Sequence, residues 1–111
     1  MTVEKCREAL NSTVFVKGNM DADITAGYTS DLLSDVMGNA PDNSVLVTIQ
    51  AHKNTVAVAS LAGITAVVLC NGRTVPEDMR QAAENEGITL LGTEKNQFTA
   101  SALIARELGM V

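Results

Sequence analysis

Hydrophobic residues along this chain form short continuous runs that are separated by longer segments with helical spacing. The runs predict strands, because β-branched and aromatic residues favour extended backbone. They occupy residues 13–17 (TVFVK), 45–49 (VLVTI), 64–70 (ITAVVLC) and 88–92 (ITLLG), while the Gly-bearing loop after the first run has room for a short strand near residues 24–29 (ITAGYT). The last three runs are almost continuously apolar, which is typical of strands buried on both faces of a parallel sheet.

The segments between the runs predict helices, most of them with a recognisable start residue. They cover residues 2–10 capped by Thr2, a segment capped by Ser30 that stops near Gly38, a segment beginning after Asn54, a segment opening with Pro76, and residues 97–108. In the second helix, the apolar residues between positions 32 and 37 predict the face that turns inward. Strands and helices therefore alternate through most of the chain.

This alternation predicts the fold class. Parallel strands need crossover connections, and right-handed crossovers through helices cover both faces of a sheet. A chain of 111 residues can bury about two-thirds of its unfolded surface around one core. We expect a single domain over residues 1–111, folded as a three-layer α/β/α sandwich with a mostly parallel sheet.

Charge and aromatic content argue against nucleic acid as a partner. The net charge is −5, and the chain has one Tyr, two Phe and no Trp. It therefore lacks both the positive surface and the stacking aromatic residues that nucleic-acid binding uses. No run approaches the roughly 20 apolar residues that span a bilayer, and the start of the chain lacks the apolar region of a signal peptide. We expect a cytoplasmic protein without membrane contact.

Motifs for metals and cofactors are missing from the sequence. Cys6 and Cys70 are far apart and form no CxxC pair or Cys/His cluster, so we expect reduced thiols and no metal site. There is no phosphate-loop signature and no GxGxxG fingerprint, although the fold class could carry either. We expect no bound cofactor.

Positive charge follows the predicted strands. Four of the eight Lys and Arg residues come directly after the carboxyl end of a strand, namely Lys17, Lys53, Arg73 and Lys95. Ligands of open α/β sheets bind beyond the carboxyl ends of the strands, where helix N-termini also favour anions. The sequence therefore predicts a site for a small anionic metabolite or a nucleotide at this edge of the sheet.

Eight residues in the loops at this edge are candidate ligand-binding residues. They are His52, Lys53, Asn54, Asn71, Gly72, Arg73, Thr93 and Lys95. Two hypotheses use them differently. In the first the protein is non-catalytic, and we assign no catalytic residue. In the second it is a small enzyme of phosphoryl or acyl chemistry, with His52 as acid or base and Lys53, Arg73 and Lys95 holding the substrate.

His52 is the chain's only histidine and stands where a strand turns into a helix. A general base needs an orienting partner and a nucleophile within hydrogen-bond reach. No Ser, Cys or carboxylate stands at a recognisable offset from His52. A ligand contact or a structural role in the turn fits this position better, while the Asn54 side chain is expected to cap the helix.

The helix that follows, TVAVASLAG, is apolar on nearly all sides and built from small residues. Such a helix is either covered entirely within its own chain or packed against another molecule. We expect a two-fold homodimer that uses this surface. An adaptor that binds a partner enzyme through the same helix, residues 55–62, is the alternative.

Three longer stretches resemble a known family in their order and spacing. They are GNMDADITAGYTSDLLSDVM, TIQAHKNTVAVASLAGITAVVLCNG and AENEGITLLGTEKNQFTASALIARELG. Over residues 14–109 the chain resembles the DRTGG domain family and, more distantly, the amino-terminal domain of HPr kinase/phosphorylase. The resemblance implies a three-layer α/β fold and a regulatory or subunit-contacting module. Such domains occur alone or joined to CBS domains, inorganic pyrophosphatases and phosphotransacetylases.

The chain departs from this family at its signature residues. The Asp-Arg and Thr-Gly-Gly elements fall where this chain has Ala51-His52-Lys53 and Cys70-Asn71-Gly72. Only Gly72 carries over. The leading hypothesis is a cytoplasmic, homodimeric regulatory or accessory domain without catalytic activity that binds a small anionic ligand or nucleotide at the carboxyl ends of the strands.

Overall fold

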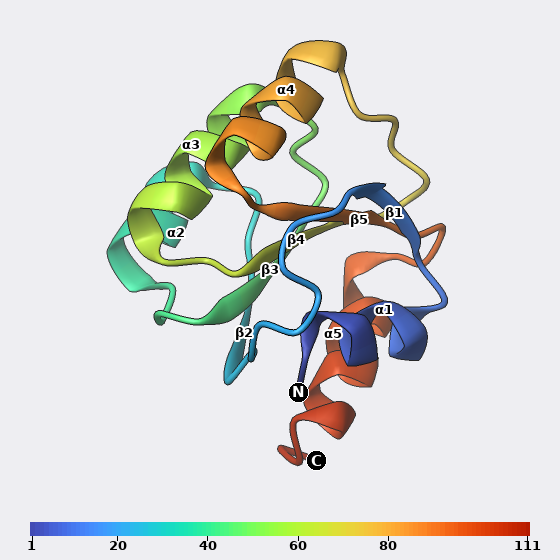
Figure 1. Cartoon of the computed structure of the whole chain (residues 1–111). Coiled ribbons are helices and arrows are strands. Elements are labelled where there is room, and N and C mark those ends of the chain that lie inside the picture. The colour runs from blue at the N-terminus through green and yellow to red at the C-terminus, as the bar shows by residue number, and fades with distance from the viewer.

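The computed structural model describes all residues, Met1–Val111, and contains five strands and five helices (Figure 1). The strands are β1 (Thr13–Val16), β2 (Ala26–Thr29), β3 (Ser44–Thr48), β4 (Ala66–Leu69) and β5 (Thr89–Gly92). The helices are α1 (Val3–Leu10), α2 (Leu33–Asn39), α3 (Lys53–Ala62), α4 (Glu77–Glu86) and α5 (Gln97–Glu107). Every predicted strand is present, with bounds that differ by up to two residues.

One mostly parallel sheet forms the middle layer. Its strand order is β1-β5-β4-β3-β2. The four strands β2 to β5 are parallel to their neighbours, whereas β1 pairs antiparallel with β5. Helices α2, α3 and α4 lie on one face and α1 and α5 on the other (Figure 1). The predicted three-layer α/β/α sandwich is confirmed.

Each face of the sheet has its own core of twelve buried residues. Successive strand residues point to opposite faces, so Val45 and Val47 enter the core under α1 and α5 while Leu46 enters the core under α2, α3 and α4. This explains the continuous apolar runs in the sequence. Each fully buried Val or Leu side chain stabilises the fold by about 1.5 to 3 kcal/mol relative to exposure.

Two helix starts differ in how well the sequence predicted them. Thr2 caps α1 as predicted, because its hydroxyl accepts from the N–H of Lys5. The expected start of α3 was wrong: the helix begins at Lys53, and its cap is His52, whose Nδ1 accepts from the N–H of Asn54. Asn54 lies inside the first turn and its side chain caps nothing there.

The second helix is shorter than the sequence pattern indicated. It begins at Leu33 after Leu32 and not after Ser30, and Val36 is its one buried residue. Leu32 and Met37 are 64% and 45% exposed, so the predicted inward face is wrong for them. Ser30 still stabilises the turn, since its Oγ accepts from the N–H of Leu32.

None of the five helices combines the length and the hydrophobicity that a membrane span requires.

Candidate functional site

The carboxyl edge of the sheet is built from the loops that follow β2, β3, β4 and β5. The antiparallel β1 begins at this edge, because Thr13 pairs with Gly92 at the end of β5. The segment from the end of α1 to Thr13 therefore borders the same edge. The expectation that the loops after the parallel strands share one edge is confirmed by the register of these strands.

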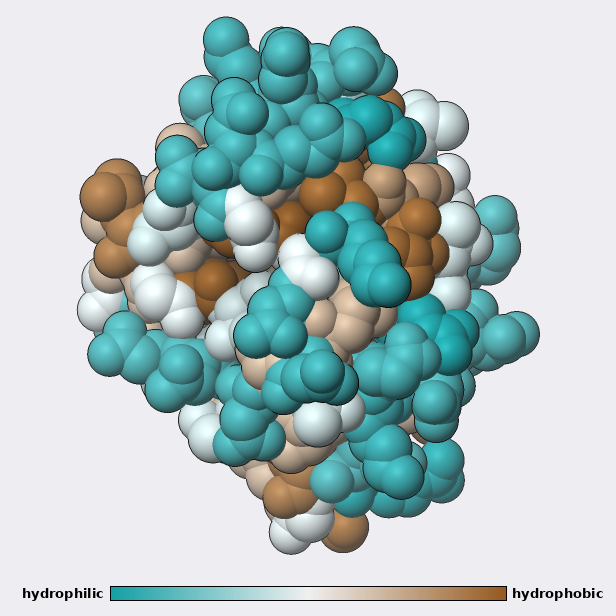
Figure 2. Space-filling view, in the orientation of Figure 1, coloured by the Kyte–Doolittle hydropathy of each residue, from teal (hydrophilic) through white to brown (hydrophobic).

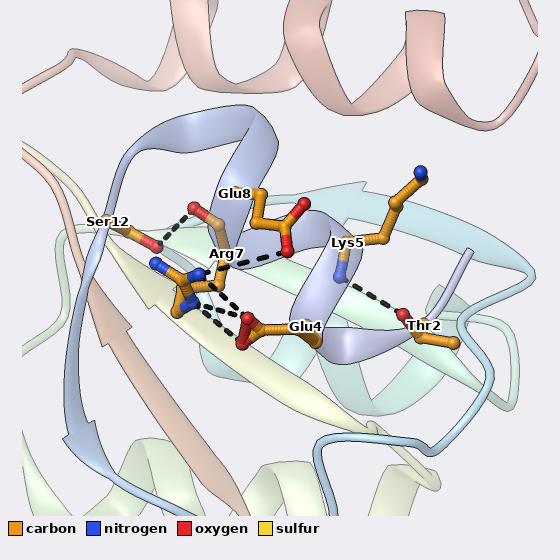
Figure 3. A network of polar contacts seen from close by, with 6 residues as sticks. All are labelled: Thr2, Glu4, Lys5, Arg7, Glu8 and Ser12. Carbon is orange, nitrogen blue, oxygen red and sulfur yellow. Dashed lines mark hydrogen bonds and ion pairs between the residues drawn. The ribbon is translucent and has the colours of Figure 1, made fainter.

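Lys17 is the exception and corrects the predicted cluster of four cations. It follows the carboxyl end of β1, which runs antiparallel to β5, so it lies at the opposite edge of the sheet. There it lines a hollow of about 590 Å³ together with Glu4 and Arg7. Arg7 is already paired with Glu4 at 2.7 Å and approaches Glu8 at 4.0 Å (Figure 3).

The turn after β4 is a tight, fully hydrogen-bonded structure. Asn71 and Gly72 adopt φ values of 61° and 65°, in the left-handed region that Asn and Gly tolerate best. The N–H of Asn71 donates to the carbonyl of Lys95, and the N–H of Gly72 donates to that of Thr93. These two backbone donors are thus used to join the loops after β4 and β5 and are not free for an anion.

Asp31 is the central polar residue of this edge, and the sequence did not single it out. Its Oδ1 accepts from the hydroxyl of Thr48 and from the N–H of Ile49, each at 3.0 Å. Its Oδ2 accepts from the side-chain amide of Gln97 at 3.1 Å. One half-buried carboxylate thereby connects the loops after β2 and β3 with the start of α5.

The protonation of Asp31 reflects this environment. Burial acts to raise the pKa of its carboxyl group, but hydrogen bonds from Ile49, Gln97 and Thr48 and the positive charge of Arg73 outweigh burial and lower the pKa. Hydrogen bonds to a carboxylate favour its charged form. The side chain is therefore a stable anion at neutral pH. The negative charge of Asp31 and the positive charge of Arg73 therefore attract each other.

Lys95 has a structural partner. Its ammonium group donates to the carbonyl of Leu10 at 3.1 Å, at the end of α1. Its N–H donates to the Thr93 hydroxyl at 3.2 Å. Since Lys95 is anchored to α1, it is a weaker candidate for holding a ligand than the exposed Arg73.

A pocket of about 170 Å³ contains three of the eight predicted residues; we call it the Arg73 pocket. It is lined by Asn11, Thr13, Phe15, Gly72, Arg73, Thr74, Gly92, Thr93 and Glu94. Glu94 lies so close to the turn that a Cβ at position 72 would stand 2.5 Å from its carboxylate. The absence of a side chain at Gly72 therefore keeps space between the turn and Glu94.

The other predicted residues lie outside this pocket. Lys53 and Asn54 line a separate groove of about 370 Å³ between α3 and α4, which also contains Glu86. Asn71 and His52 are exposed on the loops at the carboxyl edge. The structure thus places the eight predicted residues at the carboxyl edge but does not bring them into one pocket.

Neither cysteine is suited to nucleophilic chemistry. Burial, with a smaller contribution from the charge of Glu107, raises the pKa of Cys6 to about 12. Burial and the charge of Asp31 raise the pKa of Cys70 to about 11. Both thiols stay protonated at neutral pH, and the thiolate is the reactive form. The structure contains no group of three or more His, Cys, Asp or Glu residues positioned for a metal ion.

Comparison with known proteins shows a likeness in fold. The crystal structure of the CBS and DRTGG domains of the regulatory region of Clostridium perfringens pyrophosphatase, complexed with its activator diadenosine tetraphosphate, superposes with a TM-score of 0.74 and 13% sequence identity. The match covers 93% of this chain and 45% of that chain, so this chain spans less than half of the matched protein. No protein-family profile and no curated protein sequence matches the chain. The chain therefore shares its fold with part of a regulatory region that contains CBS and DRTGG domains.

Proposed function

We propose that this chain is a DRTGG-like regulatory or accessory module without catalytic activity, and that its Arg73 pocket binds the phosphate end of a small nucleotide or phosphorylated metabolite. The observation that carries the proposal is the fold shared with a regulatory region whose structure was solved with a nucleotide activator. The resemblance of the sequence blocks to the DRTGG family supports the same assignment.

The lining of the Arg73 pocket supports a ligand with both charge and hydroxyl groups. Arg73 supplies the pocket's one cation, and guanidinium groups bind phosphate through paired N–H donors. Glu94 supplies a carboxylate that can accept hydrogen bonds from sugar hydroxyls. At about 170 Å³ the pocket is smaller than the roughly 300 to 1,000 Å³ typical of sites for whole ligands. We therefore propose that it holds one phosphate or sugar, with the rest of the ligand on the surface.

The surroundings of His52 favour this proposal over a small enzyme. Its Nδ1 accepts the N–H of Asn54 at 3.0 Å, which leaves Nε2 as the ring nitrogen free for other contacts. No hydrogen bond links the ring to a Ser, a Cys or a carboxylate. A catalytic base is normally oriented by such a partner.

The first prediction tests the pocket with a matched pair of charge substitutions. Wild-type protein is expected to be stabilised by ATP or by diadenosine tetraphosphate, by about 2.7 kcal/mol at a concentration 100 times the dissociation constant. Arg73→Gln should weaken binding by about tenfold or more, because a hydrogen bond to a charged group contributes about 1.5 to 3 kcal/mol. Thermal unfolding at increasing ligand concentration measures both values.

Lys17→Gln is the control, since it removes the same charge at the opposite edge of the sheet. It should bind within about twofold of the wild type. If neither nucleotide stabilises the wild type, or if the two variants lose affinity equally, the pocket is not the binding site. A catalytic activity that the wild type has and His52→Ala lacks would instead support the enzyme hypothesis.

We also propose that the protein forms a homodimer through α3. This helix lies between α2 and α4 and buries Thr55, Val56 and Ala59 within its own chain. Its outer side, with Ala57, Ser60 and Leu61, is exposed, and the Leu61 side chain is 76% exposed. Small residues beside one protruding Leu allow close approach of a second helix.

The second prediction concerns this outer side. Leu61→Lys is expected to convert a dimer into a monomer, because the added charges would face each other across the two-fold axis. Sedimentation velocity at about 100 μM protein measures the change. Phe98→Lys is the control, since Phe98 is 84% exposed on α5 in the opposite helical layer. A wild-type monomer, or dissociation caused by Phe98→Lys alone, would contradict the proposed interface and leave the adaptor alternative for α3.

A further inference from the structure

The two edge strands of the sheet differ in how well they are protected. At β1, the Arg80 side chain from α4 donates to the carbonyl of Phe15, and the register with β5 shifts between Val14 and Val16. Both features discourage another strand from pairing there. At β2, no backbone hydrogen bond outside the sheet itself involves residues 26–29. Its outward-facing N–H and C=O groups are therefore open.

An apolar groove lies directly beside the open strand, between β2 and α5; we call it the β2 groove. Its volume is about 170 Å³, and its lining residues are Gly27, Tyr28, Thr29, Val47, Ser101, Ile104, Ala105, Leu108 and Met110. Hydrophobic surface is visible at the C-terminal end of α5 (Figure 2), where Met110 is 68% exposed. An open edge next to an apolar groove is the arrangement that recognises an extended peptide.

Charge is distributed unevenly along the sequence, and two carboxylates adjoin β2. Asp31 follows the strand, and Asp35 accepts a hydrogen bond from the hydroxyl of Tyr28, a β2 residue. Five aspartates and no Lys or Arg occur between Gly18 and His52, namely Asp21, Asp23, Asp31, Asp35 and Asp42. The remaining eight acidic residues balance the eight Lys and Arg. The net charge of −5 therefore equals the charge of residues 18–52, which also include the loop before β2, where Asp23 pairs with the N-terminal ammonium group.

We propose that the edge of β2 and the β2 groove bind an extended, basic segment of a partner protein, which adds to the sheet as a sixth strand. Main-chain hydrogen bonds to β2 would supply affinity. Alternate side chains of the partner would face the apolar groove, and its Lys or Arg residues would meet Asp31 and Asp35 beside the strand. A second copy is the weaker occupant, because pairing β2 with itself would bring together the Asp31 and Asp35 carboxylates of two chains, and like charges across a strand pair repel.

This surface is separate from the Arg73 pocket. The strand order places β2 at one end of the sheet and β1, which borders the Arg73 pocket, at the other. Occupation of one site therefore leaves the other physically accessible. Peptide binding at β2 therefore does not depend on nucleotide binding at the Arg73 pocket, and an experiment can disprove either one without affecting the other.

The third prediction uses a short synthetic peptide of alternating lysine and valine as the probe. It should bind at low salt, lose affinity as salt rises, and slow hydrogen exchange at residues 26–29. Gly27→Val should weaken it by about tenfold or more. A Cβ at position 27 would lie 3.5 Å from an Ile104 methyl and 3.8 Å from a Val45 methyl, which is ordinary van der Waals contact, and the larger valine side chain should fill part of the groove.

Gly38→Val is the matched control, because no atom lies within 4 Å of a Cβ at that position. The affinity of this variant for the peptide should stay within about twofold of the wild-type value. If Gly27→Val does not fold, Ala105→Lys, which places a charge on the α5 side of the groove, should weaken binding similarly. Equal binding of an alternating glutamate and valine peptide would overturn the proposal. Protection of residues 26–29 without peptide, together with dimer formation, would also overturn it and identify a second copy as the occupant.

Discussion

Replacing Leu46 with alanine is expected to lower the free energy of unfolding by about 2 to 5 kcal/mol, the range seen for fully buried Leu residues. Leu46 is on the internal strand β3, is 0% exposed and points into the core under α2, α3 and α4. Small domains have total stabilities of about 5 to 15 kcal/mol, so this one substitution removes a large part. Urea unfolding followed by circular dichroism measures the change.

The control is the same substitution at an exposed position. Leu32 is 64% exposed before α2, and Leu32→Ala should change stability by no more than about 0.5 kcal/mol. Equal effects at the two positions would mean that Leu46 is not enclosed between the sheet and the helices. The packing of α2, α3 and α4 against the sheet would then be wrong.

The second large effect is expected at Asp31. Asp31→Ala removes the acceptor for Ile49, Thr48 and Gln97 and should destabilise the protein by about 2 to 3 kcal/mol at pH 7, because donors that lose their partner keep their desolvation cost. Asp21→Ala is the control, since Asp21 is exposed and its carboxylate has no hydrogen bond. It should change stability by about 0.5 kcal/mol or less.

The same carboxylate gives a pH dependence with a defined sign. The folded protein lowers the pKa of Asp31 below its unfolded value, so the folded state favours the charged form. The resulting stabilisation is complete above the unfolded pKa of about 3.9 and is lost as the pH falls through the folded pKa. Wild type should therefore lose its advantage over Asp31→Ala in acid. A constant difference between the two proteins from pH 7 to pH 2 would contradict this role.

The sequence was most informative where burial alone determines the pattern. The runs at residues 45–49, 64–70 and 88–92 are buried on both sides, and a continuous apolar run is the direct result of such burial. The cap at Thr2 was predictable for a similar reason, because it depends on residues within a single turn.

Strand direction was harder to infer and caused the error at Lys17. Pairing of β1 with β5 connects residues at opposite ends of the chain, and no local signal in TVFVK specifies antiparallel pairing. Lys17 was therefore grouped with Lys53, Arg73 and Lys95. The exposure of Thr13 and Val14, which is typical of an edge strand, becomes known only from the structure.

Asp31 was missed because its role depends on contacts that are remote in sequence. Its partners Thr48 and Gln97 are 17 and 66 residues away, and they meet it only when the loops after β2 and β3 adjoin α5. The one local signal was an aspartate two residues after the end of a strand, at the carboxyl edge. The cap of α3 was hard to predict for a local reason. His52 and Asn54 stand two residues apart in the same turn, and either side chain could have capped the helix.

The most direct test of the account is a titration of isotope-labelled protein with ATP, followed through backbone amide chemical shifts. Binding at the Arg73 pocket predicts that the largest changes occur at Gly72, Arg73, Thr93 and Glu94, and that Arg73→Gln removes them while Lys17→Gln preserves them. Changes concentrated near Lys17 and Arg7, or no changes at millimolar ATP, would contradict the proposed ligand-binding role.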